Sequence, residues 1–340
     1  MACSLPPHNA MWNRQTLFAW AHELGFAEAA LCRADAFDDV RAAVSQQPVI
    51  RERNQLRFDP LAEYREAKSL AVLLWPYRPA PIPQRREVFI DSYYDASNAA
   101  YHAAQELESR AVAAGGFLRA NVPYPAREAA VRAGMGIIGK NGLLITPSYG
   151  TRVVIILLAT DLPFTQADKK PNKATPDGNS LHEEKTGCSA CGRCKKACPV
   201  NAIDMEGPNH PERCLRNFMM EGVVVPEDAR EKMGMRLIGC DICQRICPMQ
   251  PDLSCDAHAP VLLDDFVTLD EEAFSQNIKH LAERIGRNTA RPQRVRAQAA
   301  LLAGILCDPA YQPILERWAQ SPFEAVREHA LWALERIRGH

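Results

Sequence analysis

The chain has 340 residues, of which 47% are hydrophobic and 24% charged, and its formal net charge at pH 7 is −1. This composition is typical of a globular protein of two or three domains, and the balanced charge excludes an overall attraction to nucleic acid or membranes. The N-terminus lacks the basic start and apolar core of a signal peptide, and the most apolar run, 153–159, is too short to span a bilayer. We therefore expect a cytoplasmic protein without a membrane span.

The N-terminal half alternates predicted helices and strands. Residues 13–25 place leucine and tryptophan at helical spacing and end at a glycine, and residues 96–114 show an alanine-rich helical spacing. Three apolar segments indicate strands: 27–34, 69–75 and 151–164. Strands that alternate with helices predict an α/β domain over residues 1–165. The polar segment 166–186, with two prolines, is expected to be a linker.

Twelve cysteines are distributed unevenly along the chain. Eight lie between Cys188 and Cys247. A disulfide framework is usually spread through a small secreted chain, so this dense group indicates metal binding. The scattered cysteines are expected to behave as small hydrophobic residues: Cys3, Cys32, Cys255 and Cys307.

The spacing within the dense group indicates two iron–sulfur clusters. The first four cysteines follow C-x2-C-x2-C-x3-C-P, in which three thiolates bind one 4Fe-4S cluster and the fourth binds another. A later C-x2-C-x3-C-P group and Cys214 supply the other four cysteines. Each cluster then has four thiolate ligands, of which three come from one part of the sequence and the fourth from another. The first set is Cys188, Cys191, Cys194 and Cys247, and the second set is Cys198, Cys214, Cys240 and Cys243. Two structural zinc sites are the alternative, although zinc favours paired C-x2-C knuckles. We expect a ferredoxin-like domain over residues 187–255.

The C-terminal region, 256–340, contains a repeat. VRAQAALLA at Val295 and VREHALWAL at Val326 are 31 residues apart, and a turn and a second helix are predicted between them. This arrangement predicts α-helical, HEAT-like repeats.

A basic stretch, Lys279–Arg296, precedes the second half of this region. It contains six Lys or Arg residues and one Glu, in a chain of net charge −1. The stretch is predicted to contact a phosphate backbone, and a solvated helix face is the alternative.

Four segments resemble the epoxyqueuosine reductase family. They are Arg57–Pro79 with its Arg-x-Asp-Pro start, Ala130–Phe164 with GKNGLLITPSYG, the second cysteine group Ile238–Pro248, and REHALWAL near the C-terminus. The resemblance covers nearly the whole chain. It implies a cobalamin-dependent reductase with two 4Fe-4S clusters, which completes queuosine at the wobble position of tRNA by removing an epoxide oxygen.

The resemblance also implies where cobalamin binds. The residues expected to contact it are Arg57, Lys140, Asn141, Leu144, Thr146, Gly150 and Thr151. We expect Gly134, Gly136 and Gly139 to let the backbone approach a large flat ligand, and the turn 146–150 to offer exposed amides and hydroxyls. A simple turn between strands is the alternative. The Asp-x-His-x-x-Gly motif that supplies a histidine to cobalt in many B12 proteins does not occur in the sequence, as in the family.

Two segments depart from the family pattern. The proton-donating aspartate of the family aligns with Ala120, beside Asn121, and neither side chain is a general acid. The family motif Cys-Ile-Ser-Tyr-Leu-Thr-Ile-Glu is CLRNFMME here, and it keeps only Glu221 of the polar residues. Tyr124 is the candidate replacement proton donor, and a packing role is its alternative. Tyr93 and Tyr94 are further candidates.

These patterns together predict an oxidoreductase that converts epoxyqueuosine to queuosine in tRNA. We expect it to bind tRNA through 279–296 and to receive electrons from an external donor such as ferredoxin or flavodoxin. The departures leave two alternatives. One is a related corrinoid and iron–sulfur reductase of a small molecule, with chemistry like that of reductive dehalogenases. The other is an electron-transfer protein without a substrate of its own.

Overall fold

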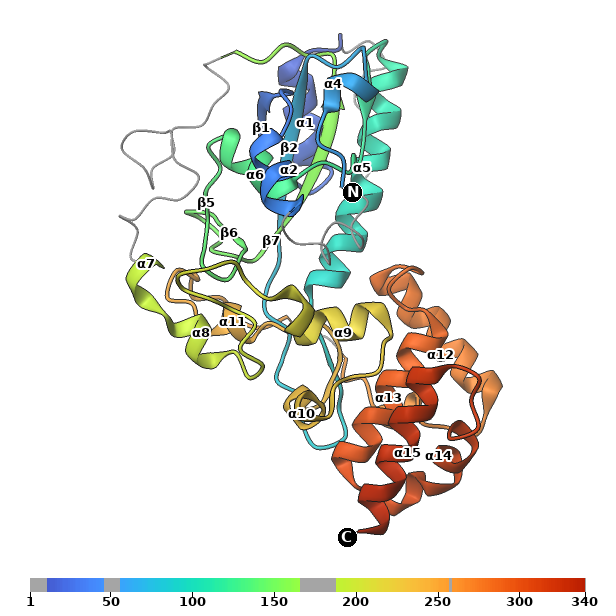
Figure 1. Ribbon diagram of the computed structural model, residues 1–340. Helices are drawn as coiled ribbons and strands as arrows, with labels where there is room; N and C mark the ends of the chain where they lie inside the picture. Colours follow the sequence, from blue (N-terminus) through green and yellow to red (C-terminus); the bar gives the residue numbers. More distant parts are fainter. Residues whose placement is uncertain (1–10, 46–55, 166–187, 257–258, 340) are drawn as a thin grey trace. The chain divides into compact units, whose positions relative to one another are not determined.

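The computed structural model describes residues 11–45, 56–165, 188–256 and 259–339 (Figure 1). Cys3 and the predicted linker 166–186 lie outside these residues. The chain divides into two compact units, which are described separately. Unit 1 comprises Met1–Tyr77, Ala99–Cys191 and Met249–Pro251, and unit 2 comprises Arg78–Asn98, Gly192–Pro248 and Asp252–His340.

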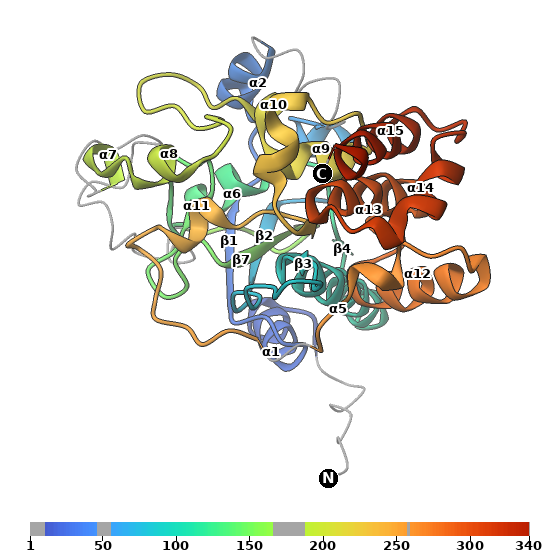
Figure 2. The ribbon, with the colours of Figure 1, turned by 90° about the horizontal axis from the view of Figure 1, so that it is seen from below.

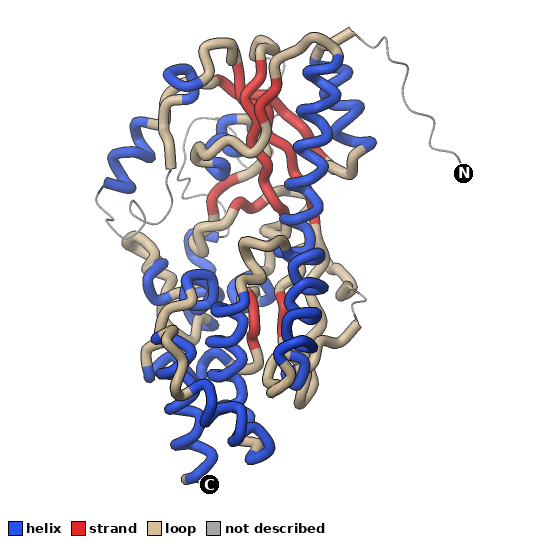
Figure 3. The backbone as a smooth tube through the Cα atoms, turned by 90° about the vertical axis from the view of Figure 1, so that its right-hand side faces the viewer, coloured by secondary structure: helices blue, strands red, loops and turns tan. Residues whose placement is uncertain are grey.

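Unit 1 is built on a four-stranded sheet. Its strands lie in the order β1 (Glu28–Arg33), β2 (Ser69–Pro76), β7 (Val153–Thr160) and β4 (Leu118–Arg119), which confirms the three strands expected from sequence. Figure 3 shows these strands side by side, with helices packed around them. The first six residues of β2 are all buried, as its continuous apolar run predicts.

The strands of this sheet pair antiparallel, which differs from the parallel pairing that an α/β alternation favours. Arg33 at the end of β1 lies opposite Ser69 at the start of β2. Pro76 at the end of β2 lies opposite Val153 at the start of β7. Each long connection therefore leaves and re-enters the sheet at the same end, so its helices do not cross over to a parallel strand.

Helices and a hairpin complete unit 1. The helices are α1 (Arg14–Glu23), α2 (Asp38–Ser45), α4 (Pro60–Glu63), α6 (Ala126–Arg132), α7 (Cys188–Cys191) and α5 (Tyr93–Ala113), whose first turns belong to unit 2. The hairpin pairs β5 (Ile137–Ile138) with β6 (Leu144–Ile145). Helix α1 begins at Asn13, whose side chain accepts a hydrogen bond from Thr16 N, 3.0 Å away. Helices α1 and α5 confirm the two helices predicted in this half.

Unit 2 is mainly helical, and one hydrophobic core joins its parts. The α-helices are α8 (Arg193–Ala197), α9 (Leu215–Glu221), α10 (Glu227–Arg230), α11 (Ile242–Arg245), α12 (Glu271–Ile285), α13 (Pro292–Leu306), α14 (Gln312–Trp318) and α15 (Glu324–Arg338). Short 3-10 helices lie at η2 (Pro211–Arg213), η3 (Glu231–Met233), η4 (Leu263–Asp265) and η5 (Pro309–Tyr311). Strands β3 (Phe89–Ile90) and β8 (Arg236–Ile238) form a parallel pair. The core extends from α9 to α15, and the boundary expected at residue 255 stays a prediction.

The repeated segments lie in two helices that pack together. VRAQAALLA lies in α13 and VREHALWAL in α15, with α14 between them in sequence, and Figure 2 shows these helices side by side. A Cβ at Gly304 of α13 would lie 2.7 Å from the ring of Trp332 on α15, so the glycine permits this close crossing. The predicted helices are confirmed, and their HEAT-like character stays a prediction. Among the described residues, no helix is long and apolar enough to cross a membrane.

Candidate metal centre and neighbouring cofactor site

The cysteines assigned to the second set converge in unit 2. Burial raises the pKa of the Cys243 thiol well above its ordinary value, and its neighbours Cys240, Cys214, Cys194 and Cys198 raise it further. Burial also raises the pKa of Cys240 to about 11, and Cys214 contributes to this rise. The hydrogen bond from the Ile242 N–H and the charge of Arg236 lower the pKa and offset part of the effect. The folded chain therefore gathers the four predicted thiols around α11, where a metal cluster would replace protons that these sites hold tightly.

The first set is distributed over both units. Cys188 and Cys191 lie in α7 of unit 1, whereas Cys194 and Cys247 belong to unit 2. Among the described residues, no three His, Cys, Asp or Glu side chains are arranged to hold a single metal ion. A 4Fe-4S cluster does not need that arrangement, because its four thiolates bind four different iron atoms.

The predicted corrinoid-facing segment lies next to a thiol of the first set. The backbone N–H of Lys140 donates a hydrogen bond to Cys188 Sγ, 3.4 Å away, and both residues belong to unit 1. Lys140 and Asn141 are half-buried at the tip of the β5–β6 hairpin. Hydrogen bonds of this kind orient a ligating sulfur and tune its cluster.

The glycines of this segment serve the hairpin itself. Gly134 has φ +74° and follows the end of α6. A Cβ at Gly136 would lie 2.2 Å from the carbonyl oxygen of Ile145, and one at Gly139 would lie 2.7 Å from the Ile145 side chain. At Gly136 and Gly139 the missing side chains make room for β6. The expectation that these glycines also let the backbone approach a flat ligand stays a prediction.

The turn that follows the hairpin uses its own threonine hydroxyls. The Thr146 hydroxyl accepts from Tyr149 N at 3.0 Å, and the Thr146 N–H donates to Gly150 O at 2.8 Å. Thr146 and Thr151 are 2% and 3% exposed, and the Gln250 amide donates to the Thr151 hydroxyl. Thr146 is therefore not one of the exposed hydroxyls expected of the turn 146–150, whereas Ser148 in the same turn is exposed. Leu144 is buried.

Two predicted site residues meet at a carboxylate that sequence reasoning missed. The buried Tyr124 hydroxyl donates to Glu63 Oε2 at 3.0 Å, and Arg57 pairs with the same oxygen at 2.7 Å. Burial is the largest cause that raises the pKa of Tyr124, and Glu63 raises it further. The Arg57 N–H also donates to Pro123 O, 2.9 Å away. Arg57 is thus part of a charged cluster with Tyr124.

A second carboxylate lies where the family aspartate is missing. Glu108 on α5 accepts from the backbone N–H of Ala120 at 2.8 Å and pairs with Arg119 at 2.8 Å. The loop 119–124 therefore has Glu108 at one end and Glu63 at the other. Glu63 lies within the family-like segment Arg57–Pro79, but neither glutamate belongs to a catalytic motif that would mark it as a site residue.

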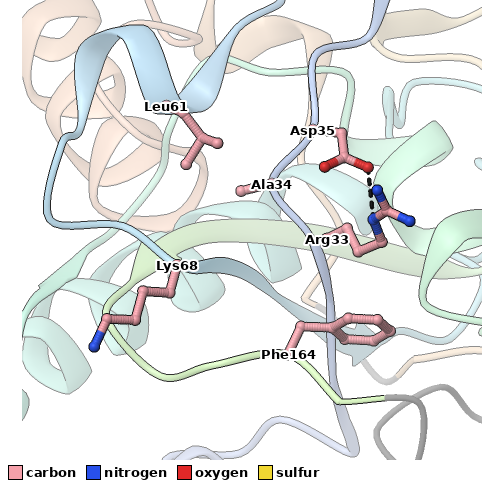
Figure 4. Close-up of a pocket in the computed structure, with 6 residues that line it drawn as sticks. All are labelled: Arg33, Ala34, Asp35, Leu61, Lys68 and Phe164. Carbon is pink, nitrogen blue, oxygen red and sulfur yellow. Dashed lines mark ion pairs between the residues drawn. The ribbon is translucent and has the colours of Figure 1, made fainter.

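A shallow pocket in unit 1 involves none of the predicted site residues. It is lined by Arg33, Ala34, Asp35, Leu61, Lys68 and Phe164 (Figure 4). Arg33 and Asp35 neutralise each other across 2.6 Å, and both side chains are more than half exposed. Its charges are therefore largely screened by solvent, and we assign it no role.

Comparison with known proteins agrees with this arrangement. Residues 187–250 match the family model described as a 4Fe-4S double cluster binding domain, which confirms the prediction of a two-cluster segment. The epoxyqueuosine reductase of Listeria monocytogenes is 26% identical over 96% of this chain and 89% of its own length. That of Bacillus subtilis is 27% identical over 62% of this chain, an alignment that spans about half (53%) of the relative.

A solved structure shares the fold. It is the crystal structure of an epoxyqueuosine reductase with a tRNA-Tyr epoxyqueuosine-modified tRNA stem loop, and it superposes with a TM-score of 0.76 at 22% identity. The match covers 95% of this chain and 89% of that one. The chain is thus a homologue of the proteins named epoxyqueuosine reductase, and it has their fold.

Proposed function

We propose that the chain is a cobalamin- and iron–sulfur-dependent reductase that removes the epoxide oxygen of epoxyqueuosine in tRNA. The observation that carries the proposal is the double-cluster segment, 187–250, within a chain that is homologous over 96% of its length to a named epoxyqueuosine reductase. Loss of an epoxide oxygen as water consumes two electrons and two protons. Two one-electron clusters suit the delivery of those electrons from an external donor.

The two cysteine sets are the proposed cluster ligands. The thiol chemistry fits, since Cys243 has four thiol neighbours, Cys194, Cys198, Cys214 and Cys240. Binding iron releases the thiol protons, so cluster assembly also contributes to folding of the segment. The second set has all its members within unit 2.

The hairpin tip is the proposed corrinoid contact. Lys140 and Asn141 are half-buried there, and the Lys140 N–H lies against Cys188 of the first set. A group held at this tip therefore adjoins the thiol through which the first cluster would be anchored. When bound, cobalamin would supply the reducing cobalt centre, and the protein would hold it and exclude water.

Tyr124 and Glu63 are the proposed proton-transfer pair. The raised pKa of Tyr124 makes it a weak acid, but an alkoxide that develops at an opened epoxide is a stronger base than a phenolate. The Glu63 side chain is 27% exposed, so water can reach the carboxylate that accepts the Tyr124 hydrogen bond. This pair would take over the role that an aspartate at position 120 has in the family.

The basic stretch supplies the proposed tRNA contact. Arg284 pairs with Asp95 at 3.0 Å, and Arg296 pairs with Glu271 at 2.6 Å, so these two cations are neutralised within unit 2. Arg287 and Arg291 are exposed at the junction of α12 and α13. They can therefore meet phosphates, in line with the stem loop bound to the solved relative.

The test is conversion of the substrate by the loaded protein. Anaerobically reconstituted full-length chain, with cobalamin and a chemical reductant, is incubated with tRNA that carries epoxyqueuosine. We expect queuosine, which differs by one oxygen in nucleoside mass spectrometry. Unchanged epoxyqueuosine in a preparation that holds both clusters and the corrinoid would contradict the proposal.

That negative result would favour a second candidate, a reductase of a small molecule with the same cofactors. Ala120 and the CLRNFMME segment favour it, because both departures remove polar side chains that the family pattern has.

A further inference from the structure

A cation is held between two tyrosines beside a proposed cluster ligand. Helix α9 begins directly after Cys214 and carries Arg216. The Arg216 guanidinium carbon lies 5.2 Å from the ring centroid of Tyr93 and 5.5 Å from that of Tyr94. The two rings meet edge to face, with centroids 5.3 Å apart and an interplanar angle of 88°. All these residues belong to unit 2.

The cation–π arrangement of Arg216 with Tyr93 and Tyr94 packs against the backbone next to Cys240, a second proposed cluster ligand. Tyr94 is 4% exposed, and Gly239, directly before Cys240, packs against it. A Cβ at Gly239 would lie 2.9 Å from Tyr94 Cε2 and 2.5 Å from Asp91 Cβ. The position of Arg216 is therefore set by rigid packing on both sides, next to Cys214 in sequence and, through Tyr94, next to the Cys240 loop.

The charge of Arg216 is permanent in this environment. An arginine guanidinium is always protonated in proteins, and the neighbours of Arg216 are Tyr93, Tyr94, Cys214 and Asp91. Asp91, 4% exposed, is the only carboxylate among these neighbours. A half-buried guanidinium is screened less by water than a surface cation, so its field acts strongly on a nearby redox centre.

We propose that Arg216 raises the reduction potential of the second cluster by stabilising the extra negative charge of its reduced form. The inference rests on the proposed assignment of Cys198, Cys214, Cys240 and Cys243 to that cluster. Charge and solvent exposure around a cluster are among the factors that set its potential. Arg216 stands where the family motif has serine, so this cation would give the present chain a cluster that is easier to reduce.

The experiment measures midpoint potentials of both clusters in the reconstituted full chain, by EPR-monitored redox titration. R216Q should shift one cluster to a more negative potential, by a roughly tenfold loss in its reduced-to-oxidised ratio, which is ~59 mV for one electron. R216K, which retains the charge, should keep most of the original potential. R213Q is the matched control: Arg213 also adjoins Cys214, but its side chain is 56% exposed and solvent screens it.

Iron and sulfide are measured first in every variant. A parent chain that does not hold two clusters would refute the proposed function. If both clusters are present and each has the same potential in R216Q as in the parent, only the role of Arg216 is refuted. An equal shift in R213Q would also refute it. R216M, which keeps apolar contact with the tyrosine rings, provides a second neutral variant. Loss of the second cluster from both neutral variants would show that Arg216 holds the ligand loop, and would overturn the tuning role.

Discussion

The hydrogen bond between Tyr124 and Glu63 joins residues that are 61 positions apart. If the pair transfers protons, removing its carboxylate should cost on the order of 10²- to 10⁴-fold in turnover, the usual contribution of general acid–base catalysis. We expect E63Q to show this loss, and Y124F to lower turnover as well, in assays of epoxyqueuosine reduction with loaded enzyme.

Glu66 offers a control for this prediction, since it is an exposed glutamate three residues away. E66Q should retain the parent rate. Cluster content and thermal unfolding are measured alongside, because E63Q also removes the partner of Arg57. Full activity of correctly loaded E63Q would exclude Glu63 from proton transfer.

His329 should make the stability of unit 2 depend on pH. It is 1% exposed, its Nε2 accepts from Val225 N at 2.9 Å, and its Nδ1 therefore carries the hydrogen that meets Ala297 O at 2.9 Å. Burial lowers its pKa from 6.5 to about 4. Between these values the unfolded chain binds a proton that the folded chain does not, so stability falls as pH falls from 6.5 to 4, by about 3 kcal/mol in total.

Urea unfolding between pH 4 and pH 7.5 measures this effect. H329Q should be less stable than the parent at neutral pH and should lack this part of the pH dependence. The exposed His102 gives the matched variant, H102Q, whose pH dependence should follow the parent. An H329Q curve parallel to that of the parent would show that another group causes the acid destabilisation.

At the scale of elements, the crossing of α13 and α15 depends on one glycine. Alanine at position 304 would gain up to about 1 kcal/mol of helix propensity. Its Cβ, however, would lie 2.7 Å from Trp332 and 2.8 Å from Ala333, and such overpacking costs about 1–3 kcal/mol. We therefore expect G304A to be destabilised, by about 1–2 kcal/mol, in urea unfolding. The control is Q293A, on the exposed face of the same helix, which should have the stability of the parent or slightly more. A G304A variant more stable than the parent would show that the two helices can move apart to accept the added methyl group.

In the predicted assignment, Cys243 within α11 binds the second cluster, whereas Cys247, two residues after the end of α11, binds the first. C243S should remove the second cluster, and C247S the first, although the two positions are four residues apart. Each variant should retain about half of the iron and sulfide, and the two should lose different EPR signals. C255S, at an exposed cysteine outside both sets, should keep both clusters. Loss of the same signal from C243S and C247S would refute the assignment.

Elements with continuous local patterns could be predicted from the sequence, but their pairing could not. The segments 70–75 and 153–159 are apolar throughout, and they lie in β2 and β7. Their antiparallel pairing depends on where the chain re-enters the sheet after more than seventy residues, which no local pattern records. The cysteine spacing is a local signal and led to the double-cluster segment, whereas the meeting of Arg57, Glu63 and Tyr124 is produced only by folding.

At the scale of the whole molecule, a nearly neutral chain must bind RNA through a local concentration of charge. Reversing the charges of Arg287 and Arg291 together, in R287E/R291E, should weaken tRNA binding. The slope of log binding constant against log salt concentration should become shallower by about 0.9 for each phosphate that the protein no longer neutralises. Binding is measured by titration at several salt concentrations. The double variant R65E/K68E, at exposed positions of unit 1, changes the net charge equally and should leave the slope unchanged. Equal slopes in all three proteins would refute the basic surface as the site of RNA binding.

The two units are interleaved along the chain. Residues 78–98 belong to unit 2 although unit 1 precedes and follows them, and within that segment β3 pairs with β8, which lies almost 150 residues later. No single cut leaves both units whole, because each unit is assembled from segments that alternate along the chain with segments of the other. Gene fusion or exchange of cassettes at one junction would meet the same obstacle, so we expect the two units to have been inherited together.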